Sequence, residues 1–504
     1  MNNTKRLFSV AAALGLFLLN ALSLTACGSG ETQEVLRIYN WEDYISTEDD
    51  EEGGTVDLIA AFEEAYDCKV EYSTFGTNEN MYNELQINPG SYDLVCPSDY
   101  MIMKMIKEDM LEPFSEDFKQ NSAYAENVSP YIRNIFESNY ALVEENGKQV
   151  RHYWSDYSIG YMWGTMGFMY NPEAVSEEAV SSWLALDRYT DPEDGVLNRA
   201  TLKDSVRDTY FYALACVYNE ELKELAAKHD EGGLTDEEYT AAVAKIMNRT
   251  DEESGEKARL YLRNVKKNIY GFEVDGGKND MVTGKINVNF CWSGDAAFAI
   301  WEVSEEAGKS LYYSVPDYVS NVWFDGWVIP KGGNVSLAEK FLDFISTPEN
   351  AISNMNYIGY TSVIAGDQVY EDFILDSFAV DEADFEEDTE YEEYNVGYFF
   401  TDDPAEWKNY TFTAETDDIK GMLGAQYPTK EVVTRCAVMQ YFDEQANNRI
   451  NQMWEDVKGA EVPPGSLLFI GVVVLVLSGI YLLSRYGNDW FHRKPKKGYV
   501  KIEK

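Results

Sequence analysis

Histidine is scarce in this sequence, and the short motifs of common nucleotide-dependent enzymes are missing. The chain has 504 residues and only three histidines. It contains no Gly-x-Ser-x-Gly nucleophile motif, no Gly-x-Gly-x-x-Gly dinucleotide motif and no phosphate-binding loop. We therefore expect no cofactor, no metal and no enzymatic activity. The scarcity of histidine excludes His-rich metal sites, whereas an all-carboxylate site stays open. A hydrolase that uses two carboxylates stays open as an alternative, because chance pairs of acids occur in any chain this acidic.

Cysteine and basic residues are also few. Of the six cysteines, five are widely scattered and form no Cys-x-x-Cys pair: Cys68, Cys96, Cys216, Cys291 and Cys436. We expect them to be mainly buried thiols. The 41 lysines and arginines stand against 88 aspartates and glutamates, which gives a formal net charge of −47. This charge argues against nucleic acid as a partner and favours cations, although it also fits plain solubility.

The N-terminus has the pattern of a secretory signal. A basic pair, Lys5-Arg6, precedes an apolar run that ends in Leu24-Thr25-Ala26-Cys27. A cysteine at the cleavage point resembles the lipobox of bacterial lipoproteins. We predict a lipoprotein signal peptide at residues 1–26, lipidation of Cys27 and a polar tether at 27–34. An ordinary signal peptide with an incidental cysteine is the alternative.

The C-terminus contains an uncharged apolar segment. Residues 466–483 carry no charged side chain and are about as long as the shortest bilayer-spanning helices. Pro463-Pro464-Gly465 precedes the segment, and several lysines and arginines follow it. The pattern predicts a transmembrane helix at 466–483 and a basic cytoplasmic tail at 484–504. The predicted location is the cell membrane, with the ectodomain on the external face and an anchor at each end.

Strand and helix signals alternate from Val35 onward. Val35–Tyr39 is a β-prone run, Lys69–Thr74 alternates like a strand and Tyr92–Cys96 is a third strand, with helical patterns between and after them. This order predicts an α/β fold with a parallel sheet covered by helices. In such sheets, ligands bind beyond the carboxyl ends of the strands. Two further series begin near Gly167 and Trp327.

Two segments read as insertions into this pattern. The first spans about 217–270 and includes a helical hairpin at Glu220–Met247, in which Thr235 and Glu238 form a capping box. Its acids do not have the spacing of a calcium-binding loop. The second is the acidic, aromatic stretch Asp381–Asp403.

An aromatic residue beside a carboxylate recurs at the predicted strand ends. The four instances are Trp41-Glu42-Asp43-Tyr44, Ser98-Asp99-Tyr100, Trp292-Ser293-Gly294-Asp295 and Trp323-Phe324-Asp325. A polyamine needs this combination, because carboxylates bind its ammonium groups and aromatic faces cover its methylene chain and also attract cations. For any single pair, a core tryptophan beside a solvated acid is an equally ordinary explanation.

At these residues the chain resembles the spermidine/putrescine-binding proteins of bacterial polyamine ABC importers. The matching pieces occur in the same order and spacing: Tyr39-Asn40-Trp41-Glu42-Asp43-Tyr44, Tyr92 to Tyr100, Asp204 to Asp208, Asn289 to Gly294, and Ile358-Gly359-Tyr360. The resemblance implies a two-lobed periplasmic-binding-protein clamp of type II, to which the sequence adds the C-terminal transmembrane helix. Its implied boundaries are 35–165 and 323–385 for lobe 1, and 166–322 and 386–457 for lobe 2.

The resemblance also implies how the site works. Aromatic side chains would box the methylene chain of a polyamine, and the closed clamp would dock on the permease subunits of an ABC importer. Asp43, Asp208 and Asp325 would hold the amines, with Ser98 and Tyr100 as hydrogen-bonding residues. The box would consist of Trp41, Tyr44, Trp292, Trp323 and Tyr360. The implied substrate-binding residues are Trp41, Glu42, Asp43, Tyr44, Ser98, Asp99, Tyr100, Ser205, Asp208, Trp292, Asp295, Trp323, Asp325 and Tyr360.

Two positions depart from the family pattern. Ser205 stands where the family often has an acid, and Arg435 lies near the place of a C-terminal polar contact, where a cation disfavours a long polyamine. The alternative is a clamp of the same fold for another cationic amine or an amino-acid derivative. A ligand that carries a carboxylate would need Arg207 or Arg435 to point into the cleft.

Overall fold

The computed structural model describes residues 33–50, 54–187, 198–304 and 309–459. By its internal contacts the chain divides into two units, 1–451 and 452–504. The architecture below is that of the first unit.

The first lobe is built on a parallel three-stranded segment of sheet. Strand β1 (Val35–Trp41) lies between β2 (Lys69–Phe75) and β3 (Leu94–Val95), and it pairs with β2 from Val35 opposite Lys69 to Trp41 opposite Phe75. Helices follow these strands: α2 (Leu58–Tyr66), α3 (Asn78–Ile87) and α4 (Asp99–Lys107). The predicted alternation of strands and helices is confirmed in this part of the chain.

Two long antiparallel strands form the middle of the sheet. They are β7 (Ser158–Tyr170) and β12 (Ser320–Pro330), and every residue in both is buried. Together they give the sheet order β2-β1-β3-β12-β7-β10-β8-β9, which is parallel at both ends and antiparallel in the centre. The alternation of strands and helices predicts a parallel sheet, but it gives no sign of this central pair, because strands buried on both faces read as unbroken apolar runs.

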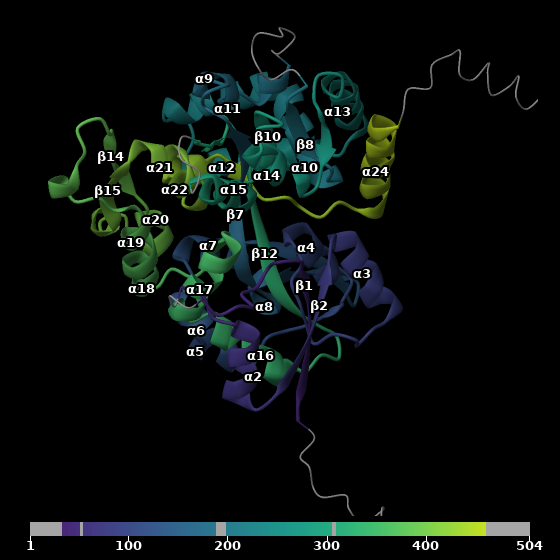
Figure 1. Cartoon of the computed structure of the whole chain (residues 1–504). Helices are drawn as coiled ribbons and strands as arrows, with labels where there is room; N and C mark the ends of the chain where they lie inside the picture. Colours follow the sequence, from purple (N-terminus) through teal and green to yellow (C-terminus); the bar gives the residue numbers. More distant parts are fainter. Residues whose placement is uncertain (1–32, 51–53, 188–197, 305–308, 460–504) are drawn as a thin grey trace, which may run out of the picture. The chain divides into compact units, whose positions relative to one another are not determined.

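The second lobe lies on the other side of these strands (Figure 1). Its sheet consists of β10 (Val288–Trp292), β8 (Ala200–Lys203) and β9 (Gly271–Glu273). Helices α10 (Val206–Val217), α14 (Gly276–Val282) and α15 (Ser293–Ser304) pack beside it. This two-lobed α/β arrangement confirms that part of the predicted fold class, while the exact lobe boundaries stay predictions.

The remaining elements of the first lobe follow α4 or follow β12. They are β4 (Leu111–Glu112), α5 (Glu116–Asn121), α6 (Ala123–Asn127), α7 (Pro130–Ser138), β5 (Tyr140–Glu145), β6 (Lys148–Tyr153), α8 (Trp154–Tyr157), α16 (Val335–Ile345), α17 (Pro348–Ile358) and β13 (Thr361–Ser362). The shorter β11 (Tyr312–Ser314) and β16 (Cys436–Ala437) pair with β7 and β12, respectively.

The first predicted insertion is helical. It contains α11 (Asn219–Asp230), α12 (Asp236–Met247) and α13 (Glu252–Val265). The capping box at the start of α12 is confirmed, because the Thr235 side chain accepts from the Glu238 backbone and the Glu238 side chain accepts from the Thr235 backbone.

The second predicted insertion includes strand β14 (Tyr391–Asn395), which pairs with β15 (Thr411–Glu415), and helix α20 (Gly397–Phe400). The Phe399 ring stacks on Trp163 of β7 at 5.3 Å, so this segment packs against the middle of the molecule. The five described cysteines are buried and unpaired, as the sequence predicts.

The prediction of a C-terminal transmembrane helix is not upheld. Among the residues that the structure describes, no helix is both long and apolar enough to cross a bilayer. The longest described helix, α24 (Glu444–Lys458), has 15 residues, and a span needs about 20. The predicted span at 466–483 lies outside the described residues, as do Cys27 and the tail at 484–504. The fold class that the structure supports is the two-lobed α/β fold alone.

Candidate ligand-binding cleft

The carboxyl ends of β1 and β2 bring the first aromatic residues to the site. Trp41 is the last residue of β1, and its ring packs on Phe75 at the end of β2, at 4.5 Å. Glu42 and Asp43 are exposed, and Asp43 adopts a left-handed conformation (φ 50°) that turns the chain sharply. This turn leaves the next residue, Tyr44, buried, with 6% of its surface exposed.

Asp325 is the carboxylate to which the first lobe supplies hydrogen bonds. Tyr44 Oη donates to one of its oxygens at 2.8 Å and Ser98 Oγ donates to the other at 2.7 Å. Asp325 lies at an irregularity in the pairing of β12 with β7 and is 8% exposed. Burial raises its pKa from 3.8 to about 6, although both hydrogen bonds lower it, and the nearby charge of Asp208 raises it further. Asp325 is therefore a buried acid, and the charge that acts on its pKa belongs to another acid, Asp208.

The N-terminus of α4 supplies three predicted residues. Ser98 precedes the helix and also accepts a hydrogen bond from Asn78 Nδ2 at 3.0 Å. Asp99 is 2% exposed and accepts from the Tyr100 backbone at 2.6 Å, and burial raises its pKa well above the ordinary value. The Tyr100 hydroxyl donates to Glu79 at 3.2 Å. Asp99 is thus buried, whereas Ser98 hydrogen-bonds directly to Asp325.

Helix α10 of the second lobe presents Asp208 to the site. Ser205 caps this helix and accepts from the Asp208 backbone at 3.4 Å. Asp208 is 8% exposed. Burial raises its pKa, while hydrogen bonds to Ser205 and Trp292 and the charges of Lys203 and Arg207 lower it. The acid that the family pattern leads one to expect at Ser205 is therefore replaced by a helix cap that orients Asp208.

Each arginine singled out in the sequence makes contacts with other parts of the protein. The Arg207 guanidinium lies over the rings of Tyr100 at 4.5 Å and Phe442 at 3.7 Å, and it donates to the Gln440 carbonyl at 2.7 Å. Arg435 donates to the Val315 carbonyl at 3.0 Å. Because Tyr100 belongs to the first lobe, the Arg207 contact also joins the two lobes.

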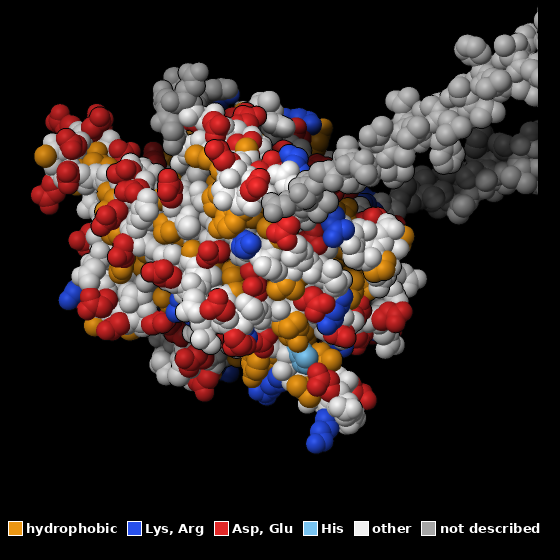
Figure 2. Space-filling view, turned by 90° about the horizontal axis from the view of Figure 1, so that it is seen from below, with side chains coloured by type: hydrophobic (Ala, Val, Ile, Leu, Met, Phe, Trp, Pro, Cys, Tyr) orange, Lys and Arg blue, Asp and Glu red, His pale blue; other side chains and the backbone are white. Residues whose placement is uncertain are grey.

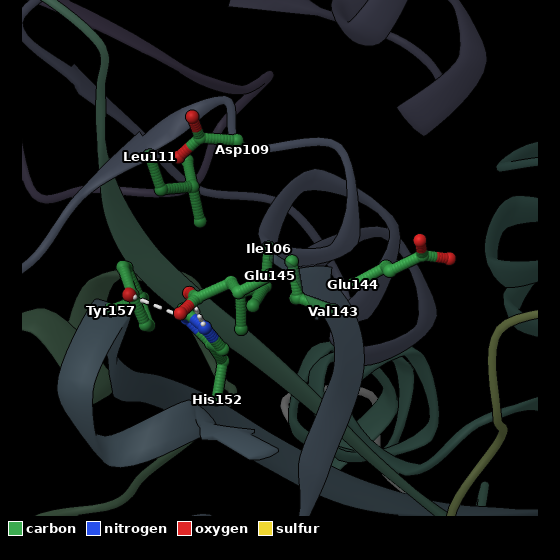
Figure 3. Close-up of a pocket in the computed structure, with 8 residues that line it drawn as sticks. All are labelled: Ile106, Asp109, Leu111, Val143, Glu144, Glu145, His152 and Tyr157. Carbon is green, nitrogen blue, oxygen red and sulfur yellow. Dashed lines mark hydrogen bonds and ion pairs between the residues drawn. The ribbon is translucent and has the colours of Figure 1, made fainter. Parts of the chain in front are cut away.

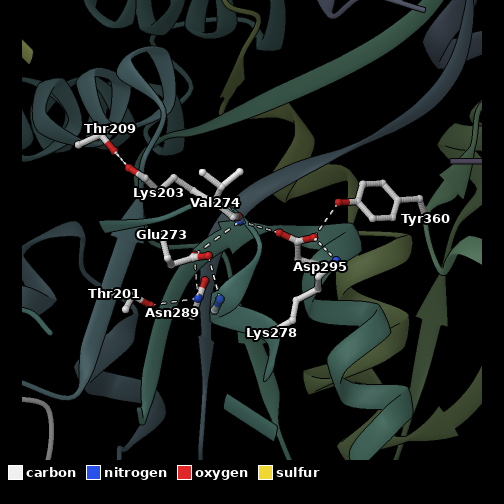
Figure 4. Close-up of polar contacts among 10 residues, drawn as sticks. Thr201, Lys203, Thr209, Glu273, Val274, Lys278, Asn289, Asp295 and Tyr360 are labelled. Atoms are coloured by element: carbon white, nitrogen blue, oxygen red, sulfur yellow. Dashed lines mark hydrogen bonds and ion pairs between the residues drawn. The ribbon is translucent and has the colours of Figure 1, made fainter. Parts of the chain in front are cut away.

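Asp295 is held by basic residues of its own lobe (Figure 4). Lys203 Nζ lies 2.7 Å from one of its oxygens and Lys278 Nζ lies 3.4 Å from the other. Tyr360, from the first lobe, donates its hydroxyl to Asp295 at 2.9 Å. Lys203 Nζ also lies 4.2 Å from the centre of the Trp292 ring. Asp295 therefore binds protein cations and joins the lobes, and its predicted contact with a substrate stays a prediction.

Three aromatic rings of the first lobe cluster at the cleft, and one of them reaches the second lobe. Tyr360 contacts Tyr44 at 5.3 Å and Trp323 at 5.7 Å, and Trp323 donates its indole N–H to the Thr165 carbonyl. The Tyr360 ring also covers Gly294, where an added Cβ would lie 2.4 Å from the ring. A glycine at that position is needed for the ring to lie against the start of α15.

Buried charge marks this region more sharply than total charge does. Acidic side chains are spread over the face drawn in Figure 2, so surface acidity does not locate a site. Seven charged side chains in the described part of the chain are buried, and six of them lie here, the seventh being Asp93. The six are Asp99, Lys203, Arg207, Asp208, Asp295 and Asp325. They are linked by ion pairs and by mutual effects on their pKa values.

Sequence reasoning found all of these acids and did not find Lys203. The signal that could have revealed it is a lysine at the end of a short apolar run, Ala200-Thr201-Leu202-Lys203, two residues before the cap of a helix. An isolated lysine is ordinarily a surface residue, so only its position at a strand end sets it apart.

A separate pocket lies on the first lobe, away from these residues (Figure 3). It is lined by Ile106, Asp109, Leu111, Val143, Glu144, Glu145, His152 and Tyr157. His152 bridges Glu145 and Tyr157 there, each at 2.7 Å. Since none of the predicted binding residues lines it, this pocket is not the candidate site.

Comparison with known proteins identifies the family. A model described as bacterial extracellular solute-binding protein matches residues 57–373. The chain belongs to this family. Its members bind solutes and are not enzymes, in agreement with the expectation from the sequence.

Two relatives of this solute-binding protein are named as spermidine/putrescine-binding proteins. The spermidine/putrescine-binding periplasmic protein of Salmonella typhimurium is 26% identical over 343 residues, which cover 68% of this chain and 80% of that protein. Its namesake from Escherichia coli is 27% identical with the same coverage. These relatives are named as periplasmic proteins, so the predicted membrane location, which depended on a C-terminal helix, is not upheld.

Solved structures agree with the fold. A putative spermidine/putrescine ABC transporter protein from Listeria monocytogenes has a TM-score of 0.56 at 25% identity and covers 84% of this chain and 99% of its own. The spermidine/putrescine substrate-binding protein PotD of Streptococcus pneumoniae has a TM-score of 0.54 with the same identity and coverage.

Proposed function

We propose that this protein captures a polyamine between its two lobes and delivers it to the permease of an ABC importer. The observation that carries the proposal is Asp325, a buried carboxylate that accepts hydrogen bonds from Tyr44 and Ser98. The charge that acts on its pKa is the negative charge of Asp208. A buried acid is stable when a cation compensates its charge. An ammonium group of a polyamine would supply that charge.

The aromatic side chains support the same ligand class. Trp41, Tyr44, Trp292, Trp323 and Tyr360 would line the methylene chain, and their faces attract cations by about 0.5–2 kcal/mol per contact. Asp325 from the first lobe and Asp208 from the second would hold the amines. Glu42 and Asp43, which are exposed, would add attraction at the rim.

Binding would proceed by closure of the lobes. Asp325 and its hydrogen-bond donors belong to the first lobe and Asp208 to the second, so a ligand meets both acids only when the lobes are together. A ligand shifts the open–closed equilibrium by its difference in affinity for the two forms, and closure about connecting strands is a familiar motion of periplasmic binding proteins. Strands β7 and β12 would carry the hinge.

The charge pattern argues against the alternative of a ligand that carries a carboxylate. Arg207 is the buried guanidinium nearest the site, and it lies in the field of Asp99 and Asp208. A carboxylate there would meet acids that already offset this arginine. A compact quaternary amine stays the second candidate, because aromatic walls bind such cations as well.

Titration calorimetry of the purified protein tests the proposal. We expect binding heat and an increase in Tm with putrescine or spermidine, and neither with an acidic amino acid such as glutamate. Choline serves as the quaternary-amine comparison. The absence of heat and of stabilisation with both polyamines would rule the proposal out.

Lipid attachment at Cys27 also stays part of the proposal. The motif Leu24-Thr25-Ala26-Cys27 supports it. Mass spectrometry of the protein purified from whole cells would show a diacylglycerol adduct on the tryptic peptide that begins at Cys27. The Cys27→Ser variant should lose the adduct, and an unmodified wild-type peptide would contradict the assignment.

A further inference from the structure

Lys203 is a buried ammonium group inside the candidate site. It ends strand β8, and 1% of its surface is exposed. Its Nζ donates to Asp295 at 2.7 Å and to the Val274 carbonyl at 2.6 Å, and Glu273 lies 3.6 Å away (Figure 4). Such complete pairing is what allows a lysine to remain charged away from water.

The surroundings of this ammonium group are those of a polyamine subsite. A carboxylate, a carbonyl oxygen and the face of Trp292, 4.2 Å from Nζ, surround it. The aliphatic chain of lysine followed by its ammonium is also chemically one end of an alkylamine. The ammonium group of Lys203 therefore occupies a position in which an amine of the ligand could bind.

A count of the buried charges then limits the ligand. Four buried acids of the site, Asp99, Asp208, Asp295 and Asp325, stand against two buried cations, Lys203 and Arg207. Lys203 is ion-paired with Asp295, and Arg207 lies in the field of both Asp99 and Asp208. Two negative charges therefore remain without a buried cation to balance them. Asp325 carries one of them, and Asp99 and Asp208 share the other. Two ammonium groups balance them, and a third would lie among acids that protein cations already offset.

We infer that the cleft selects a diamine of the putrescine class over a triamine such as spermidine, because Lys203 supplies one ammonium group from the protein itself. This inference rests on the proposed function and names the substrate within it. The selection is electrostatic, since a third ligand amine directed toward Asp295 would be repelled by Lys203.

The test compares affinities of the purified chain for putrescine and spermidine by calorimetry. For the wild type we expect putrescine to bind at least tenfold more tightly. In Lys203→Met, which keeps the aliphatic chain and removes the charge, the place of the lysine Nζ beside one oxygen of Asp295 becomes open to a ligand amine, while Lys278 stays 3.4 Å from the other oxygen. We expect the preference to move toward spermidine by at least tenfold. The control Lys223→Met removes an exposed lysine of α11 and should leave the preference unchanged.

A second variant separates charge from space. The double variant Lys203→Met, Asp295→Asn removes the lysine charge and also the carboxylate that would bind a third ligand amine. We expect no gain in affinity for spermidine in this variant. If Lys203→Met does not fold, the wild-type preference decides by itself. Equal affinities or a preference for spermidine in the wild type would overturn the inference and leave the proposed function standing. Failure of both amines to bind the wild type would overturn both.

Discussion

Replacing Asp325 by asparagine separates ligand binding from stability. Burial raises the pKa of the Asp325 carboxyl from 3.8 to about 6. That shift corresponds to about 3 kcal/mol against the ionised form, since one pKa unit is worth about 1.36 kcal/mol. An acid whose pKa is raised in the folded state stabilises the fold when it is protonated. This contribution is present below about pH 4 and is lost as the pH rises through about 6.

At pH 7.5 the wild-type carboxylate is ionised, and Asp325→Asn removes the cost of its burial. The amide can still accept from Tyr44 or Ser98. We therefore expect the Tm of the ligand-free variant to equal or exceed that of the wild type. Its affinity for a diamine should fall by about 2–4 kcal/mol, the usual loss when one partner of a buried charged pair is removed.

Calorimetry and thermal unfolding of the same samples measure both effects. Asp156→Asn is the matched control, because it removes the same charge from a partly exposed site on α8 that pairs with Lys119. The control should bind the ligand as the wild type does. An unchanged affinity in Asp325→Asn would remove this residue from the site, and a large drop in ligand-free Tm would show that its role is structural.

Three further predictions concern the site and its surroundings. Affinity for a diamine should be constant above pH 7 and fall by up to about tenfold per unit below pH 6, because protonation of Asp325 removes a negative charge from the site; calorimetry from pH 5 to 8 measures this, and a flat profile would contradict it. Gly294→Ala should weaken binding and lower Tm, because the new Cβ would lie 2.4 Å from the Tyr360 ring, whereas Gly276→Ala, at the start of α14 with nothing within 4 Å of the added Cβ, is the matched control and should leave binding unchanged. Thr235→Ala should cost about 1 kcal/mol in urea unfolding through loss of the α12 cap with no change in ligand affinity, and a change in affinity would indicate coupling to the cleft.

Local signals were enough to predict the first strands and helices of the chain. Strand β1, the helices after it and the turn at Ser98 follow from apolar periodicity and capping residues, which act within a few positions of each other. The carboxylate side chains at strand ends were also predictable, because the ends of parallel strands meet at one edge of a sheet. These rules bring Trp41, Ser98 and Asp99 together without knowledge of distant parts of the chain.

Contacts between distant segments could not be predicted in the same way. The pairing of Asp295 with Lys203 joins residues 92 positions apart. No sequence pattern near either residue predicts this pairing. The central antiparallel pair of strands, β7 and β12, likewise depends on partners that lie more than 150 residues apart. Sequence patterns indicate which groups a site can contain, whereas the partners of each group depend on the register of the whole sheet.

The hydrogen bond from Tyr360 to Asp295 has a kinetic consequence. It joins the first lobe to the second through protein groups alone, as does the stacking of Arg207 on Tyr100. Opening of the clamp must break both contacts whatever molecule lies between the lobes. Part of the barrier to ligand release is therefore the same for every ligand, and a variant that removes either contact should shorten the residence times of all bound amines by the same factor.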